Sequence, residues 1–122
     1  MNNEALISVD LGGTNIRAAR LDRNLNILTR VQIPTEARLG CATVIERIQS
    51  QIQLVMPTDG TPVLGIGISA PGPINPKTGY LVAPPNLGDC HNVPLVALLT
   101  AAFNQPVYLG NDANVAALAE TA

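Results

Sequence analysis

Apolar residues at the start of the chain fall in short runs separated by turn residues, which predicts three consecutive β-strands. Residues 5–10 form an apolar run that ends at Asp10, and the pair Gly12 and Gly13 follows it closely. Residues 15–22 have strand character, and a polar turn leads into residues 27–33, where apolar and polar positions alternate until Pro34. A period of two is typical of a half-buried strand, and glycine pairs and polar clusters mark turns. The pattern therefore predicts a meander of three strands.

The pattern becomes helical after residue 39. Val44, Ile48, Ile52 and Val55 recur at helical spacing over residues 39–56, and Pro57 ends the run. Beyond it we expect a buried strand over residues 62–70, an extended loop over 74–93 with a small hairpin near 77–79, a helix over 94–103, a short strand over 107–109 and a helix over 112–120. The order βββαβαβα indicates an α/β fold class with a mixed sheet covered by helices.

Composition indicates one folded domain and disfavours several classes of partner. The chain has 122 residues, of which 47% are hydrophobic and 13% charged, so it is expected to fold around a core. Its net charge of −2 and its 2% aromatic content disfavour nucleic acid and membrane surfaces as partners. With no apolar run near the roughly 20 residues of a membrane span, we expect a cytoplasmic protein. Cys41 and Cys90 form no C-x-x-C pair and are expected to be ordinary buried or half-buried thiols.

The turn at residues 10–14, with the sequence Asp-Leu-Gly-Gly-Thr, is the first candidate for chemistry. Gly12 and Gly13 let backbone N–H groups converge on an anion with no Cβ in the way, and the Thr14 hydroxyl adds a donor. The carboxylate of Asp10 could hold a magnesium ion beside bound phosphates. An ordinary Gly-Gly hairpin turn is the alternative, because such turns are common.

The segment at residues 110–114, with the sequence Gly-Asn-Asp-Ala-Asn, is the second candidate. A strand is expected to end here and a helix to begin, which is where open α/β sheets bind ligands and where a helix N-terminus favours negative charge. An ionised Asp112 can accept a proton from a substrate hydroxyl, and Asn111 and Asn114 can orient hydroxyls. A plain helix cap is the alternative, since Asn and Asp are preferred at helix starts.

Two other features of the sequence are weaker candidates for a functional site. The pattern Gly-x-Gly-x-x-Ala at residues 65–70 fits a loose dinucleotide-binding fingerprint, but the Pro-Gly-Pro that follows forbids the helix which that fingerprint needs. His91, the sole histidine, belongs to no serine nucleophile elbow and to no recognised metal-ligand spacing, so we expect an exposed loop histidine.

Four segments together resemble the ROK family of bacterial sugar kinases and repressors. They are the turn at residues 10–14, the sequence GIGISAPGP at 65–73, APPNL at 83–87 and GNDAN at 110–114, and they occur in the family's order and spacing. The resemblance covers essentially the whole chain but only the N-terminal part of such two-domain proteins. It implies the actin-like ATPase, ribonuclease H-like fold, with residues 1–122 as the N-terminal, smaller lobe and the C-terminal lobe absent from this chain.

The resemblance implies an ATP-dependent hexose kinase similar to glucokinases. On the sugar side, Asp112 matches the family's catalytic base, Asn86 and Asn111 fall where the family holds sugar hydroxyls, and Gly72 lies in a loop that lines the same pocket. Glucose is the expected substrate, with other hexoses and N-acetylated hexosamines behind it.

On the nucleotide side, Asp10, Gly12, Gly13 and Thr14 match the family's first phosphate motif. ATP and Mg²⁺ are the cofactors that the resemblance implies, with Asp10 as the metal-binding residue. In phosphoryl transfer, positioning and charge stabilisation supply most of the acceleration, and the base needs only to be well placed.

The resemblance also sets limits. The family often has Pro-Gly-Trp where this chain has Gly-Asp-Cys at residues 88–90, and the family's second phosphate loop, adenine site and zinc motif lie beyond Ala122. We therefore expect the isolated lobe to be catalytically inactive and any homodimer to form through the missing lobe. The sugar-sensing lobe of a ROK-type transcriptional repressor is the alternative function. It is disfavoured because the first motif begins at residue 10, which leaves no room for a preceding DNA-binding domain, and because the chain is not basic.

Overall fold

The computed structural model of the chain describes residues 4–84, 87 and 89–110. The helix expected over residues 112–120 and the predicted site residues Asn86, Asn111 and Asp112 lie outside these ranges. The strands are β1 (Ala5–Leu11), β2 (Asn15–Leu21), β3 (Ile27–Pro34), β4 (Val63–Ser69), β5 (Ile74–Asn75), β6 (Tyr80–Leu81) and β7 (Val107–Gly110). The helices are α1 (Cys41–Val55) and α2 (Leu95–Phe103), and a short 3₁₀ turn, η1 (Ala37–Leu39), precedes α1.

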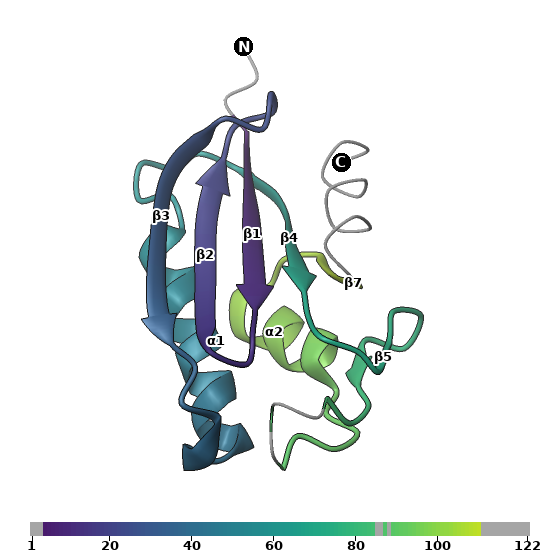
Figure 1. Cartoon of the computed structure of the whole chain (residues 1–122). Helices are drawn as coiled ribbons and strands as arrows, with labels where there is room; N and C mark the ends of the chain where they lie inside the picture. The colour runs from purple at the N-terminus through teal and green to yellow at the C-terminus, as the bar shows by residue number, and fades with distance from the viewer. Residues whose placement is uncertain (1–3, 85–86, 88, 111–122) are drawn as a thin grey trace.

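Five strands form one mixed sheet in the order β3-β2-β1-β4-β7. The meander β1-β2-β3 is antiparallel, whereas β1, β4 and β7 run parallel to one another. Figure 1 shows β1 and β4 pointing the same way beside the reversed β2. The predicted mixed sheet is confirmed, as is the small hairpin, which forms the separate two-stranded sheet β5-β6.

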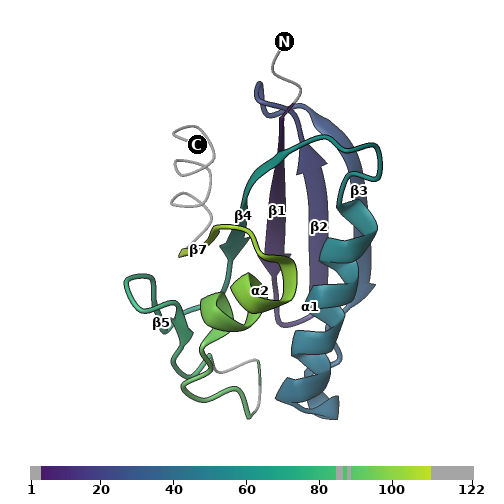
Figure 2. The same ribbon diagram turned by 180° about the vertical axis from the view of Figure 1, so that it is seen from behind.

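Both α1 and α2 lie on the same face of the sheet, as the view from behind shows (Figure 2). The four apolar residues that predicted the first helix, Val44, Ile48, Ile52 and Val55, are all 0% exposed and join the core. Their partners on the sheet are alternate residues, because successive strand side chains point to opposite faces. Those of β1 and β4 are Ile7, Val9, Leu11, Ile66 and Ile68.

The first helix begins at Cys41 rather than at Leu39, because residues 37–39 form a 3₁₀ turn that ends at Gly40. Gly40 has a φ of 103°, a conformation that residues with a Cβ rarely adopt, so the chain changes direction there before α1 starts. The apolar periodicity predicted the buried face of this helix correctly and missed its first turn.

The expectation of two free thiols is wrong, because Cys41 and Cys90 form a disulfide. Their Cα atoms are 5.1 Å apart, although the two residues are separated by 49 positions in sequence. Cys41 is the first residue of α1, and Cys90 lies in the loop between β6 and α2. The fold brings the loop against the start of the helix, and no local spacing signals such a long-range contact.

None of the helices in residues 4–84, 87 and 89–110 is long and apolar enough to cross a membrane. The loop histidine, His91, is exposed, as expected.

Candidate active site

Three parallel strands end side by side at one edge of the sheet. Asp10 of β1 pairs with Ser69 of β4, and Ser69 in turn pairs with Gly110 of β7. Since neighbouring strands lie about 4.8 Å apart, the main chains of Asp10 and Gly110 are roughly 10 Å apart. All three strands therefore end at this carboxyl edge, which is where open α/β sheets bind ligands. Figure 1 shows the turn after β1 and the chain after β4 at this edge.

The turn between β1 and β2 is tight. The Gly12 N–H donates to the Asn15 carbonyl at 2.9 Å, and a Cβ placed on Gly12 would lie 3.0 Å from that oxygen. The backbone amides of Gly13 and Thr14 donate no hydrogen bond within the part of the chain that the structure describes. Successive amides that are not used by the fold are the groups with which a turn can bind an anion.

Asp10 lies next to this turn, on the sheet face opposite α1 and α2. Its side chain is 48% exposed, and Oδ2 lies 3.3 Å from Nη1 of Arg17, directly across on β2. The Arg17 Nε donates to Oε1 of Gln32 at 2.9 Å, so the three side chains form a row across β1, β2 and β3. An exposed ion pair of this kind is weak and leaves the carboxylate accessible to a ligand.

The residues at this edge fit a magnesium ion that is shared with a substrate. Among residues 4–84, 87 and 89–110, no group of three or more His, Cys, Asp and Glu side chains could hold a metal on its own. Mg²⁺ is usually bound by only one or two carboxylates together with water and substrate phosphates. The lone carboxylate of Asp10, next to the diglycine turn, is compatible with that arrangement.

Gly72 lies at the same edge, in the segment that follows β4. It is exposed, and a Cβ placed on it would meet no atom within 4 Å. The Gly72–Pro73 peptide bond is cis, and the Pro73 carbonyl accepts a hydrogen bond from the Val82 N–H at 3.0 Å. The segment is thus tied to the loop that follows β6, which is the loop predicted to carry Asn86.

This second loop is fixed on both sides of Asn86, which itself lies outside the described residues. Leu87 is 0% exposed and donates its N–H to the Pro84 carbonyl at 3.1 Å. Oδ1 of Asp89 accepts a hydrogen bond from the Cys41 N–H at 2.7 Å, which satisfies a free amide at the start of α1. Together with the disulfide, Asp89 anchors the loop to the first helix.

Thr35 was not predicted from the sequence, yet it contacts the diglycine turn directly. It is the first residue after β3 and is 0% exposed. Its Oγ1 donates to the Gly12 carbonyl at 2.7 Å, and its N–H donates to the Thr14 carbonyl at 2.8 Å. A polar residue directly after the last alternating strand was the only signal in the sequence, and it is a weak one.

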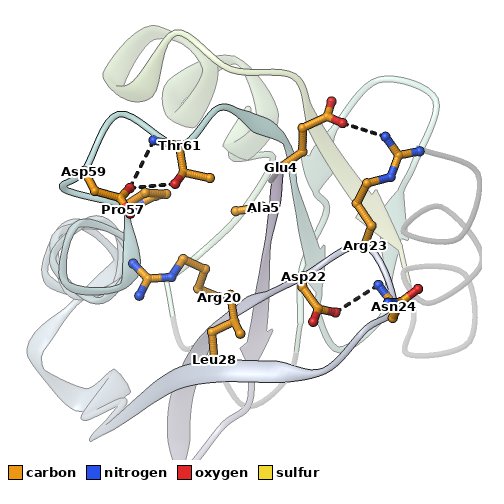
Figure 3. A pocket seen from close by; sticks show the side chains of 10 residues that line it. All are labelled: Glu4, Ala5, Arg20, Asp22, Arg23, Asn24, Leu28, Pro57, Asp59 and Thr61. Carbon is orange, nitrogen blue, oxygen red and sulfur yellow. Dashed lines mark hydrogen bonds and ion pairs between the residues drawn. The ribbon is translucent and has the colours of Figure 1, made fainter. Parts of the chain in front are cut away.

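A pocket at the opposite edge of the sheet has charged walls, but most of its polar groups bind one another (Figure 3). Arg23 donates to Glu4 at 2.6 Å, and both the Thr61 hydroxyl and N–H donate to Oδ1 of Asp59. This pocket includes Glu4 and Ala5, at the start of β1, so it lies roughly 20 Å along the strand from the diglycine turn. It is therefore separate from the predicted site.

The pKa values of two aspartates near this pocket reflect local hydrogen bonds. The backbone N–H and side chain of Asn26 lower the pKa of Asp22, and the hydroxyl of Thr61 is the main cause of the lowered pKa of Asp59. Both groups favour the charged form because they receive several hydrogen bonds. Neither carboxylate has the raised pKa of a group that holds a proton at neutral pH.

Comparison with known proteins shows the family of the chain. The profile of the ROK family matches residues 6–122. The chain belongs to the ROK family. It is 38% identical to a glucokinase of Thermotoga maritima over 115 residues, which are 94% of this chain but 36% of that protein.

Solved ROK structures have the same fold. A ROK hexokinase from Thermus thermophilus superimposes with a TM-score of 0.79 at 34% identity, over 95% of this chain and 38% of the hexokinase. A ROK glucokinase from Streptomyces griseus, solved in complex with glucose and AMPPNP, has a TM-score of 0.79 at 29% identity, over 93% of this chain and 35% of the glucokinase. The expected α/β lobe of the actin-like ATPase type is confirmed, and this ROK chain spans little more than a third of each of these relatives.

Proposed function

We propose that residues 1–122 form the N-terminal lobe of an ATP-dependent hexose kinase. The observation that carries the proposal is the row Asp10, Ser69 and Gly110, which brings the ends of three parallel strands to one edge of the sheet. The anion-binding turn follows the first strand of this row, and Asn111 and Asp112 follow the last in sequence. The S. griseus relative, which was solved in complex with glucose and AMPPNP, supports a nucleotide and a sugar as the ligands that we place at this edge.

In the proposed reaction, the sugar hydroxyl attacks the γ-phosphorus of ATP. Asp112 accepts the hydroxyl proton as the new O–P bond forms, and the bond between the γ-phosphorus and the bridging oxygen breaks to release ADP. The free amides of Gly13 and Thr14 hold the phosphate chain through hydrogen bonds. Asn86 and Asn111 orient the sugar by hydrogen bonds to its other hydroxyls.

Asp10 is the proposed magnesium-binding residue. When bound there, Mg²⁺ would neutralise charge on the phosphates of ATP. The Arg17 side chain beside Asp10 is 56% exposed, so it can move away from the carboxylate without leaving a buried charge unpaired. Glucose is the proposed sugar, because the T. maritima and S. griseus relatives are named glucokinases.

A chimaera tests this proposal most sharply, because the chain covers only 36% of the T. maritima glucokinase. This chain would replace the matched N-terminal segment of that glucokinase, and glucose-dependent release of ADP would be measured. We expect turnover by the chimaera and a loss of at least about 100-fold in kcat for Asp112→Asn, since general-base catalysis contributes about 10²–10⁴-fold. Glu46→Gln, which also removes a carboxylate but lies on the exposed face of α1, is the matched control and should keep kcat within a few-fold.

Two results would contradict the proposal. Turnover that survives Asp112→Asn with an unchanged kcat would show that Asp112 is not the base. A folded chimaera that binds glucose by calorimetry but transfers no phosphate would favour the sugar-sensing function of a repressor lobe instead.

A further inference from the structure

Thr35 is one of three polar or charged residues among the described ones that are buried in the molecule; the others are Gln51 and Ser69. Both hydrogen-bond donors of Thr35, its hydroxyl and its backbone N–H, bind the diglycine turn. The hydroxyl binds the Gly12 carbonyl at 2.7 Å, and the backbone N–H binds the Thr14 carbonyl at 2.8 Å. The end of β3 therefore holds the diglycine turn by two carbonyls that lie two residues apart.

The hydroxyl bond fixes the direction of a neighbouring amide. A trans peptide unit is planar, with its C=O and N–H on opposite sides. The Gly12 carbonyl and the Gly13 N–H belong to the same unit, so holding the carbonyl against Thr35 turns the Gly13 N–H away from Thr35. That N–H donates to no other group in the described part of the chain and is available for a ligand.

From this geometry we infer that Thr35 is a positioning residue, which orients the Gly13 amide toward a phosphate of the bound nucleotide. The inference rests on the proposed function, because it assumes that the turn binds phosphate. Glycines at positions 12 and 13 permit many backbone conformations, so without a constraint the amide would be oriented only part of the time. A buried hydroxyl with a fixed partner supplies that constraint, and its loss leaves the Gly12 carbonyl unpaired.

The test is a titration of the 122-residue chain with sodium tripolyphosphate, followed by NMR at the Gly13 amide. Thr35→Val keeps the shape of the side chain and the backbone bond to Thr14 but removes the hydroxyl. We expect Thr35→Val to weaken binding at least about fivefold, the effect of one lost hydrogen bond, and Thr35→Ser to stay within about twofold of the wild type. Thr43→Val is the matched control, because the hydroxyl of Thr43, in α1, donates to the Leu39 carbonyl of η1 rather than to the diglycine turn.

Each outcome decides one question. If the wild type shifts at Gly13 on titration and Thr35→Val binds equally well, the positioning role is wrong while the phosphate site stands. If the wild type shows no shift at Gly13, the proposed function fails at this turn. Rescue by serine distinguishes a hydroxyl effect from a packing effect, which serine would not restore. Should Thr35→Val fail to fold, Thr35→Cys, with a weak donor of similar size, takes its place under the same criterion.

Discussion

The two glycines at the carboxyl edge, Gly12 and Gly72, differ in the space that is available for a side chain. A Cβ on Gly12 would lie 3.0 Å from the Asn15 carbonyl, the same oxygen that accepts the Gly12 N–H, whereas a Cβ on Gly72 would meet nothing within 4 Å. The two residues were predicted for different roles, the first for phosphate and the second for the sugar pocket. A side chain would therefore be crowded at position 12 and would meet no neighbour at position 72.

We predict that Gly12→Ala lowers the free energy of unfolding by about 1–3 kcal/mol, because the turn must open to admit the methyl group. Gly72→Ala is the control and should stay within about 0.5 kcal/mol of the wild type. Urea denaturation of the two variants measures the difference. Equal stabilities for Gly12→Ala and Gly72→Ala would show that the turn is looser than the structure indicates.

At the scale of elements, the sequence predicted what depends on local periodicity. Alternation predicted the meander, and helical spacing predicted the buried face of α1, with Val44, Ile48 and Val55 in the core. The disulfide and the contact between Thr35 and Gly12 were missed, because they join residues 49 and 23 positions apart. Such contacts arise only when the sheet and helix have packed, and no pattern within one element signals them.

The disulfide gives a prediction for the loop between β6 and α2. The disulfide joins residues separated by 49 positions in sequence. Closing a loop of that length in the unfolded chain is expected to contribute about 4 kcal/mol of stability. The thermal unfolding midpoint should therefore fall when the wild type is reduced with dithiothreitol. The Cys41→Ser/Cys90→Ser double variant should unfold at the lower midpoint with or without the reductant. An oxidised wild type whose midpoint does not change on reduction would contradict this account.

The turns at the opposite edge predict a loss of stability in acid. The Asn26 backbone N–H is the main cause of the lowered pKa of Asp22, and the Thr61 hydroxyl is the main cause for Asp59. A carboxyl group whose pKa is lower in the folded state stabilises the fold above its unfolded pKa of about 4, and this contribution is lost as pH falls through the folded pKa. Asp22→Asn should therefore be less stable than the wild type at pH 7, and thermal melts should show the difference shrinking toward pH 2. A constant difference across this range would mean that the Asp22 charge contributes nothing.

At the scale of the molecule, the carboxyl edge is only part of a complete site. The chain spans 36% of the T. maritima glucokinase and 38% of the T. thermophilus hexokinase, and it offers the proposed phosphate-binding turn with one neighbouring carboxylate. A kinase must also exclude water from the transferred phosphate, which needs a second wall that closes on the first. The two proposed halves of the reaction, nucleotide and sugar, meet at this edge.

We therefore predict that the 122-residue chain does not phosphorylate glucose when it is mixed with Mg-ATP. A coupled assay for ADP should give the same rate for the wild type and for Asp112→Asn, at the level of the buffer control. Turnover by the wild type that disappears in the variant would show that one lobe is sufficient for catalysis.

A chemical-shift map of the chain, titrated with AMPPNP and magnesium and then with glucose, tests the central claim most directly. The account predicts that the nucleotide shifts the amides of residues 10–14 and that glucose shifts the segment around Gly72, with the pocket of Asp22 and Asp59 unaffected. Shifts that gather instead at Glu4, Arg23 and Asp59, at the opposite edge of the sheet, would contradict it.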